Sequence, residues 1–365
     1  SCMKQGNQIK NMLNKKMEHL ALPLFAIFLG FVIGGLVIAL SGYDPFATIG
    51  GILAGGFGSG YYLSATLTRA TPIIFAGLAA ALAWGSGYPS MGAAGQMALG
   101  ALASAITAIY CPGPSIVVCI VSLLAGSAVG MAVSYFSSYI CNRFEMWLLI
   151  VTLMLNYVCE NICSYLTTYV FKDPMASDAS AIQTQKITEG ILPKLFKGYA
   201  VHGGFILALL AVAGIWFMMR RTSFGYKARM GGLNPHFADY GGISSRNMMF
   251  RIMMISGALA GIGGACEVLG SRYRYVDAMI SSPGYAWTGV ITTLMAGHSP
   301  LGVLFCSIFM AGISTGGSAI ERSMGLSSDI VSIISGVITL LVTARFSLKL
   351  KRNKKQQKGG KTNDN

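Results

Sequence analysis

Charged side chains are scarce in this chain of 365 residues. Only 11% of its residues are Asp, Glu, Lys or Arg, whereas 53% are hydrophobic, and the mean hydropathy is +0.59. Soluble domains carry roughly 25% charged residues. The composition therefore excludes an ordinary soluble protein. It predicts an all-α polytopic membrane protein, because long apolar helices satisfy their own backbone hydrogen bonds in lipid.

The chain also lacks the side-chain clusters that metal sites, disulfide frameworks and catalytic centres require. Its eight cysteines include no CxxC pair, and its four histidines lie far apart in the sequence. No nucleophile stands beside a base in a recognisable motif. A membrane enzyme is therefore disfavoured, and we expect this chain to bind no metal and no cofactor.

Apolar segments separated by polar stretches predict about ten transmembrane helices, some of them short or broken. Residues 20–344 form this membrane domain, residues 1–19 form a polar N-terminus, and residues 345–365 form a basic tail predicted to be disordered. The Gly-rich stretch 41–71 is expected to lie at the membrane surface and to contain a short helix. The predicted segments are 20–40, 72–84, 91–110, 115–140, 146–171, 202–219, 252–271, 285–296, 301–319 and 328–344.

Lys and Arg are distributed unevenly between the two sides that ten alternating crossings create. One side collects 19 of the 27: four precede residue 20, one is Arg143, six lie in residues 220–251 and eight follow residue 344. Basic loops of membrane proteins face the cytoplasm. We therefore expect both termini and the loop 220–251 on the cytoplasmic side.

The loop 220–251 contains the pattern of a very short capped helix. Asn234 is the expected N-cap, Pro235 fits the first helical position, and Gly241 is the expected left-handed stop. Between them, Phe237 and Tyr240 are three residues apart and share one helical face, with Ala238 and Asp239 completing the turn. Such a helix suits a socket on another protein, although an ordinary connector is the alternative.

Polar groups inside the predicted spans mark candidate pathway residues. The helix pattern is broken at 85–90, and Gln96 follows close behind Gly92 and Gly95. Backbone breaks at membrane depth occur where a cavity or a protein neighbour satisfies them. We expect Gln96 to face a ligand, the alternative being a hydrogen bond to a neighbouring helix.

Two further spans carry polar stripes at helical spacing. Asn156 and Glu160 share a face of the segment 146–171, and Glu267 follows a GxxxG pair, Gly257 and Gly261, in the segment 252–271. An ionisable group in a span faces the bundle interior or water. A pathway role and a helix–helix hydrogen bond both explain these residues.

Four stretches resemble one known family in the same order and spacing: residues 152–157 (TLMLNY), 224–244, 257–270 and 282–302. The chain is similar to permease subunits of bacterial ABC importers of the ribose/nucleoside type, and above all to those of the nucleoside branch that works with a BMP-type lipoprotein. The resemblance implies that family's permease fold. It also implies a second permease subunit, related or identical, cytoplasmic ATPases that bind ATP and Mg²⁺, an extracytoplasmic binding lipoprotein, and location in the bacterial plasma membrane.

The same resemblance assigns roles to residues. It makes 234–241 the coupling helix that docks in the ATPase, and it places Met91, Trp287 and Thr288 near the substrate pathway. Here the sequence departs from the family, because Ser90 to Gln96 lack the usual Asn and Glu, and Thr288 replaces an Asp. The expected function is import of nucleosides, with ribose or another sugar as the alternative. A self-sufficient ion-coupled transporter or channel is the rival from a different class.

Overall fold

The computed structural model describes residues 44–174, 182–196, 198–233 and 235–324, together with Ala39 and Gly336. The chain divides into two compact units, residues 1–58 with 313–365 and residues 59–312. Apart from those two single residues, the predicted N-terminus, first span, last span and basic tail lie outside the described residues. Those four assignments stay predictions.

Helices make up almost all of the described chain, which confirms the all-α prediction. The β-structure of the described part is limited to two isolated bridges. Four helices are short: α2 (Pro45–Phe57), α8 (Ser223–Leu233), α9 (Pro235–Tyr240) and α11 (Tyr285–Met295). Seven are long and apolar enough to cross a membrane: α3 (Gly60–Gly85), α4 (Ala93–Tyr110), α5 (Ser115–Arg143), α6 (Leu148–Tyr165) with its π-helical extension η1 (Leu166–Val170), α7 (Gly204–Arg221), α10 (Ser245–Glu267) with its extension η2 (Val268–Arg272), and α12 (Pro300–Met324).

The helix α3 corrects the prediction of a surface stretch up to residue 71. It begins at Gly60 and continues through Pro72, while only α2 corresponds to the expected short helix. The Thr68 and Thr71 hydroxyls donate to the Ser64 and Leu67 carbonyls of the preceding turn, at 2.9 and 3.0 Å. The buried residues of α3 lie mostly at 70–83, whereas residues of its first turn, such as Tyr61 and Leu63, are exposed.

The helix α11 corrects the expectation of ten complete crossings. It has 11 residues and is therefore about 16 Å long, roughly half of the ~30 Å hydrocarbon core. The segment before it, residues 273–284, has no regular helix. The eighth predicted segment, 285–296, is therefore a half-length helix that follows an irregular stretch.

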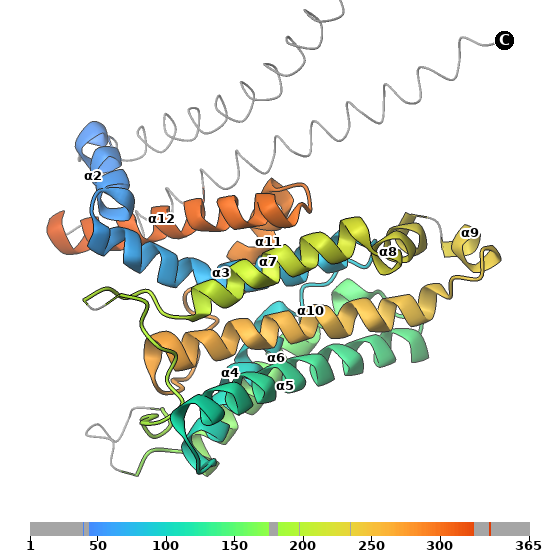
Figure 1. Cartoon of the computed structure of the whole chain (residues 1–365), viewed down its shortest axis with the longest axis horizontal. Helices are drawn as coiled ribbons and strands as arrows, with labels where there is room; N and C mark the ends of the chain where they lie inside the picture. The colour runs from blue at the N-terminus through green and yellow to red at the C-terminus, as the bar shows by residue number, and fades with distance from the viewer. Residues whose placement is uncertain are drawn as a thin grey trace, which may run out of the picture. The chain divides into compact units, whose positions relative to one another are not determined.

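The helix α10 runs through the middle of the unit formed by residues 59–312, beside α3, α4 and α5 (Figure 1). Glycines bring these backbones together. A Cβ atom added at Gly100 of α4 would lie 2.7 Å from the Cα of Gly261, and one added at Gly126 of α5 would lie 2.9 Å from the Gly100 oxygen. The glycines predicted to serve close packing do so.

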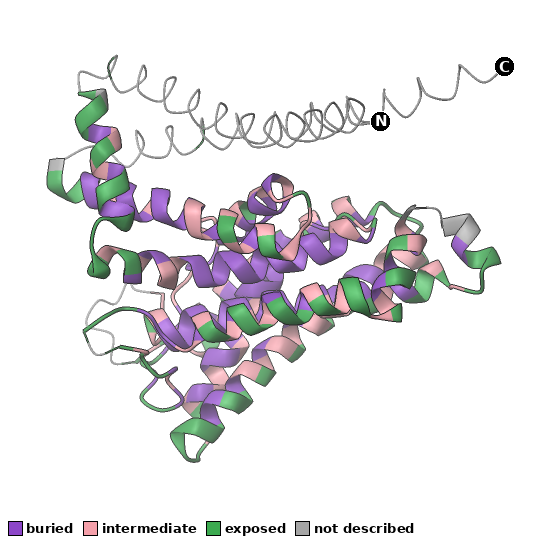
Figure 2. Ribbon diagram, turned by 45° about the horizontal axis from the view of Figure 1, so that its top comes forward, coloured by how far each residue is buried: buried purple, intermediate pink, exposed green. Residues whose placement is uncertain are grey.

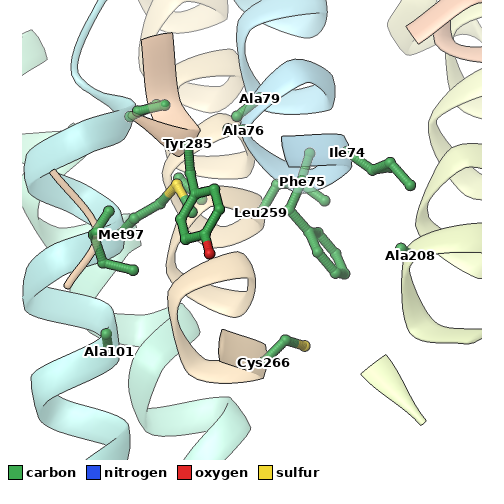
Figure 3. Packing of buried hydrophobic residues seen from close by; sticks show 14 of the residues in the cluster. Ile74, Phe75, Ala76, Ala79, Met97, Ala101, Ala208, Leu259, Cys266 and Tyr285 are labelled. Atoms are coloured by element: carbon green, nitrogen blue, oxygen red, sulfur yellow. The ribbon is translucent and has the colours of Figure 1, made fainter. Parts of the chain in front are cut away.

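The buried side chains lie along the contact between these helices. Figure 2 shows that the buried residues concentrate where helices meet, while the outward faces are exposed. Figure 3 shows the Tyr285 ring within this core, together with Met97, Phe75 and Leu259. The Ser256 hydroxyl adds a hydrogen bond of 2.9 Å to the Ala79 carbonyl of α3.

The two ends of this unit are built differently. The helices α8 and α9 lie at one end, which we call the α9 end (Figure 1). At the opposite end, residues 182–192 pair with the end of α10 and the stretch after it, for example through Thr184 N–H to the Tyr275 oxygen at 2.9 Å. His202 is buried there and packs on Gly270, and its burial lowers its pKa to about 4.

In the other unit, α2 packs closely on the last turns of α12. The Asp44 carboxylate caps α2 by accepting the Phe46 N–H at 2.9 Å. A Cβ atom added at Gly55 would lie 2.7 Å from the Ala319 Cβ. The spacing of small residues therefore allows this helix pair to approach at backbone distance.

Candidate functional site

The turn between α3 and α4, residues 86–92, lies against the loop region at the α9 end. Gly87 has a φ of 79°, and a Cβ atom there would lie 2.7 Å from the Gly232 oxygen of α8. The Tyr88 hydroxyl donates to the Ser245 carbonyl at the start of α10, at 2.9 Å. Burial, with a further contribution from the Asp239 carboxylate, raises the pKa of Tyr88 to about 12. The break that the sequence predicted is thus a hairpin turn, and its neighbours are α8 and α10.

The helix α6 holds the same turn from the other side. The Asn156 side chain accepts the Gly95 N–H at 2.9 Å and donates to the Met91 carbonyl at 2.7 Å. One turn earlier, the Thr152 hydroxyl accepts the Met91 N–H at 3.1 Å. The polar stripe on α6 therefore binds the backbone of the turn, which is the helix–helix alternative left open by the sequence.

Gln96 and Ser86 each have a buried side-chain polar atom near the turn without a partner among the described residues. In Gln96 this atom is Nε2, and the side chain is 1% exposed. Gly92 and Gly95 leave room for the neighbours: a Cβ at Gly92 would lie 2.7 Å from Gln96 Nε2, and one at Gly95 would lie 2.9 Å from the Cys159 Cβ. A buried amide without a partner is costly, so Gln96 remains a candidate for a ligand contact.

The two acidic residues both bind the stretch around 273–285. The Ser281 hydroxyl donates to the Glu160 Oε1 at 2.5 Å, and the Tyr285 hydroxyl donates to the Glu267 Oε1 at 3.2 Å. Glu267 is 2% exposed and also lies 3.6 Å from the Arg272 Nε. Glu160 is therefore tied to the irregular segment, and Glu267 to the residues that border it on both sides.

That segment is the discontinuous element of the described bundle. Tyr273 and Ala278 have φ values of 57° and 55°, in the left-handed region that non-glycine residues seldom adopt. Asp277 accepts the Ser164 hydroxyl at 3.1 Å, while Tyr275 is 2% exposed. Irregular backbone at membrane depth requires protein or water around it. The sequence prediction placed the break at 85–90 and missed this one, although the Ser-Ser-Pro-Gly run at 281–284 was a signal for it.

The remaining pathway candidates lie at the start of α11. Trp287 is 49% exposed, and Thr288 donates its N–H to the Gly284 carbonyl at 2.9 Å. The structure thus divides the predicted pathway residues into two clusters. One surrounds the turn 86–92 with Asn156 and Gln96, and the other surrounds residues 273–288 with both acids.

The short helix predicted in the loop 220–251 is present as α9, and its coupling role stays a prediction. Ala238 is 1% exposed, the Asp239 carboxylate accepts the Ser245 N–H at 3.1 Å, and Tyr240 is 94% exposed. The left-handed residue after the helix is Gly242, with a φ of 74°, so the expected stop at Gly241 was one residue too early. Asn234 and the side chains of Pro235 and Phe237 lie outside the described part of the chain.

The helix α8 was not expected from the sequence. Its residues, Ser223–Leu233, contain three glycines and read as loop. Tertiary contact with the turn 86–92 compensates for their low helix propensity, because the glycines permit the close approach described above.

Comparison with known proteins relates this chain to a family of transport permeases. A family model described as "branched-chain amino acid transport system / permease component" matches residues 62–343. The guanosine ABC transporter permease protein NupP of Bacillus subtilis is 29% identical over 345 residues, which cover 94% of this chain and 99% of that protein.

Two further relatives cover most of the chain. The glucose ABC transporter permease protein TsgB13 of Haloferax volcanii is 28% identical, covering 89% of this chain and 87% of its own. The nucleoside ABC transporter permease protein NupB of Lactococcus lactis is 24% identical, covering 93% and 94% respectively. No solved structure matches the chain.

Proposed function

We propose, from the premise that this chain belongs to the permease-component family of branched-chain amino acid transport systems, that it is the membrane-spanning subunit of an ATP-driven nucleoside importer. Two of the three relatives above are named as guanosine or nucleoside permeases, which supports nucleosides over sugars as the substrate. The glucose permease among them keeps a sugar as the second candidate.

The observation that carries this proposal is a continuous line of contacts from α9 to the membrane helices. Tyr240 is exposed on α9, Asp239 binds the first residue of α10, and that residue binds Tyr88. Tyr88 belongs to the turn that Asn156 of α6 holds. A force applied to α9 by another protein would therefore reach three membrane helices without passing through a flexible link.

Closure of the partner ATPases on ATP supplies that force in the proposed mechanism. Movement of α9 shifts the start of α10 and the turn 86–92. At the other end of α10, Glu267 is bonded to Tyr285, so the same movement changes the position of the irregular segment 273–284. Two arrangements of this segment would open the pathway alternately to either side.

The proposed assembly orients the chain. The α9 end faces the cytoplasm, where the basic loop and both termini lie and where the ATPases bind. The end formed by residues 182–202 faces outward, where a substrate-binding lipoprotein delivers the nucleoside. A second permease subunit, related or identical, completes the membrane part in this assembly.

Nucleoside uptake tests the substrate assignment. In a strain lacking this gene, uptake of radiolabelled guanosine should fall at least about tenfold and return when the gene is restored. Uptake that survives ATP depletion but collapses with the ion gradient would instead establish a self-sufficient secondary transporter. Unchanged uptake of every nucleoside, with loss of glucose uptake, would replace the nucleoside by a sugar.

Introducing negative charge on α9 tests the coupling assignment. The double substitution Phe237→Asp with Tyr240→Asp places two carboxylates on the helix, and we expect ATPase co-purification to fall at least about tenfold, because burying unpaired charge in an apolar socket is costly. Phe196→Asp is the matched control, since Phe196 is also exposed, at 65%, but belongs to the opposite end. Full co-purification of the double variant would contradict the coupling assignment.

A further inference from the structure

The outward face of α6 differs from the outward faces of its neighbours. Its exposed residues include Tyr157 and Tyr165, each 60% exposed, and between them the amide Asn161. The helix α5 also exposes tyrosines, toward its C-terminal end, but its exposed residues nearer the middle, such as Leu124, are apolar. The exposed residues of α7 inside the helix, such as Leu210, are apolar as well. The exposed amide near the middle of α6 is what distinguishes its face.

The depth of Asn161 makes this difference significant. The helix α6 and its extension η1 together have 23 residues and are about 34 Å long. Asn161 lies nine residues before Val170, the end of η1, and therefore about 14 Å from that end. An exposed amide at this depth is unfavourable against hydrocarbon, so it should meet water, protein or a ligand.

A groove runs along the same face. It has a volume of about 460 Å³ and is lined by Tyr157, Val158, Asn161, Ile162, Tyr165 and Leu166. Pockets for small molecules have volumes of about 300–1,000 Å³, mostly apolar walls and a few polar groups. The Asn161 Nδ2 donates to the Tyr157 carbonyl at 2.7 Å, which leaves a second Nδ2 hydrogen and the Oδ1 acceptor for another molecule.

We infer that this groove is the nucleobase-binding part of the substrate pathway. An aromatic base has two flat apolar faces and an edge of hydrogen-bond donors and acceptors. Tyr157 and Tyr165 offer rings for stacking, and Asn161 between them offers both a donor and an acceptor to the edge. The donor and acceptor of Asn161 match the edge of a base, and the planar faces of a base suit stacking on a tyrosine ring. The inference rests on the proposed nucleoside function and names its site.

The position of the groove relative to the irregular segment fits this role. Glu160 directly precedes Asn161, and Ser164 follows it by three residues; both are half-buried. Glu160 is bonded to Ser281, and Ser164 is bonded to Asp277. A base in the groove therefore lies on the helix that holds residues 273–284. Movement of that segment would change access to the bound nucleoside.

Thiol labelling tests the groove in membranes that contain the complete importer. The variant Asn161→Cys is exposed to a water-soluble maleimide, with Leu124→Cys as the control at matched depth, nine residues from the corresponding end of α5. Wild-type protein gives the background from the native cysteines. We expect the thiol at 161 to react at least about fivefold faster than the thiol at 124, and saturating guanosine to slow it about tenfold. Glucose should have no effect.

Several results would overturn the inference. Equal labelling at 161 and 124 would show that the face is covered by lipid or protein, and labelling that guanosine does not slow would show water without the nucleoside. Protection by glucose alone would make the occupant a sugar. Guanosine uptake by the wild-type importer, measured in the same membranes, reports on the proposed function separately from the groove.

Aromatic substitutions separate stacking from a structural role. Tyr165→Phe keeps the ring and should leave uptake within about twofold of wild type. Tyr165→Leu removes the ring and should raise the KM for guanosine about tenfold, with unchanged ATPase co-purification, since stacking on an aromatic side chain is worth about 1–3 kcal/mol per base. Equal KM values for the two variants would count against stacking.

Discussion

Replacing Gly261 by alanine should destabilise the folded bundle by about 3 kcal/mol or more, because overpacking of a tight interface forces the backbones apart. A Cβ atom at this position would lie 2.9 Å from the Gly126 carbonyl carbon and 3.2 Å from the Ser127 Cα, both on α5. Neither atom can rotate away, since both belong to the backbone. The loss should appear as a lower thermal midpoint and a smaller folded fraction in size-exclusion chromatography after detergent extraction.

Gly214→Ala is the matched control for this prediction. Gly214 also lies inside a membrane helix, α7, but a Cβ atom there would have nothing within 4 Å. We expect its thermal midpoint to equal or slightly exceed that of wild type, because alanine has the higher helix propensity. Equal stability of the Gly261 and Gly214 variants would show that α5 and α10 do not meet at Gly261.

Replacing Asn156 by leucine should weaken both stability and coupling. The change removes two hydrogen bonds, to Met91 and Gly95, and leaves buried backbone groups without partners. The expected loss is about 2–4 kcal/mol from the two bonds together. Because the turn 86–92 would no longer move together with α6, we also expect nucleoside uptake to fall more than ATP hydrolysis in the reconstituted importer.

Asn142→Leu provides the comparison for Asn156. The Asn142 side chain donates to the Ser138 carbonyl of its own helix, at 2.9 Å, and so connects no two elements by this bond. Its replacement should lower the thermal midpoint by much less and leave the ratio of uptake to hydrolysis unchanged. An Asn156 variant with wild-type stability and wild-type uptake would contradict the assigned role of the turn.

The sequence predicted some features of the candidate site well, since they depend on neighbours in the chain. The helix α9 follows from a proline at its first position and a nearby glycine, although the left-handed residue proved to be Gly242. Gly257 and Gly261 were predicted to serve packing, because a GxxxG pair places two small residues on one helical face. In both cases the information lies within a few residues.

Other features could not be predicted because hydropathy does not report what covers a helix. The stretch 41–71 read as an excursion at the membrane surface, yet its second half begins α3, which continues without a break into the buried residues 70–83. The break at 85–90 left a cavity and a protein neighbour as alternatives, and its contacts are with α8, α10 and α6. Residues 273–284 carried no prediction of a second break, yet their backbone turns twice through left-handed conformations.

Composition and local pattern alone determined that the chain is a helical membrane protein with a short amphipathic helix in its basic loop, since apolar length and capping act over one or two turns. Tertiary structure alone decided that Asn156 binds Met91, 65 residues away, and that Glu160 binds Ser281, 121 residues away. A polar side chain inside a bundle has several possible partners of similar chemistry. Only the packing of the helices selects one of them, because a hydrogen bond requires its two atoms to lie within about 3 Å.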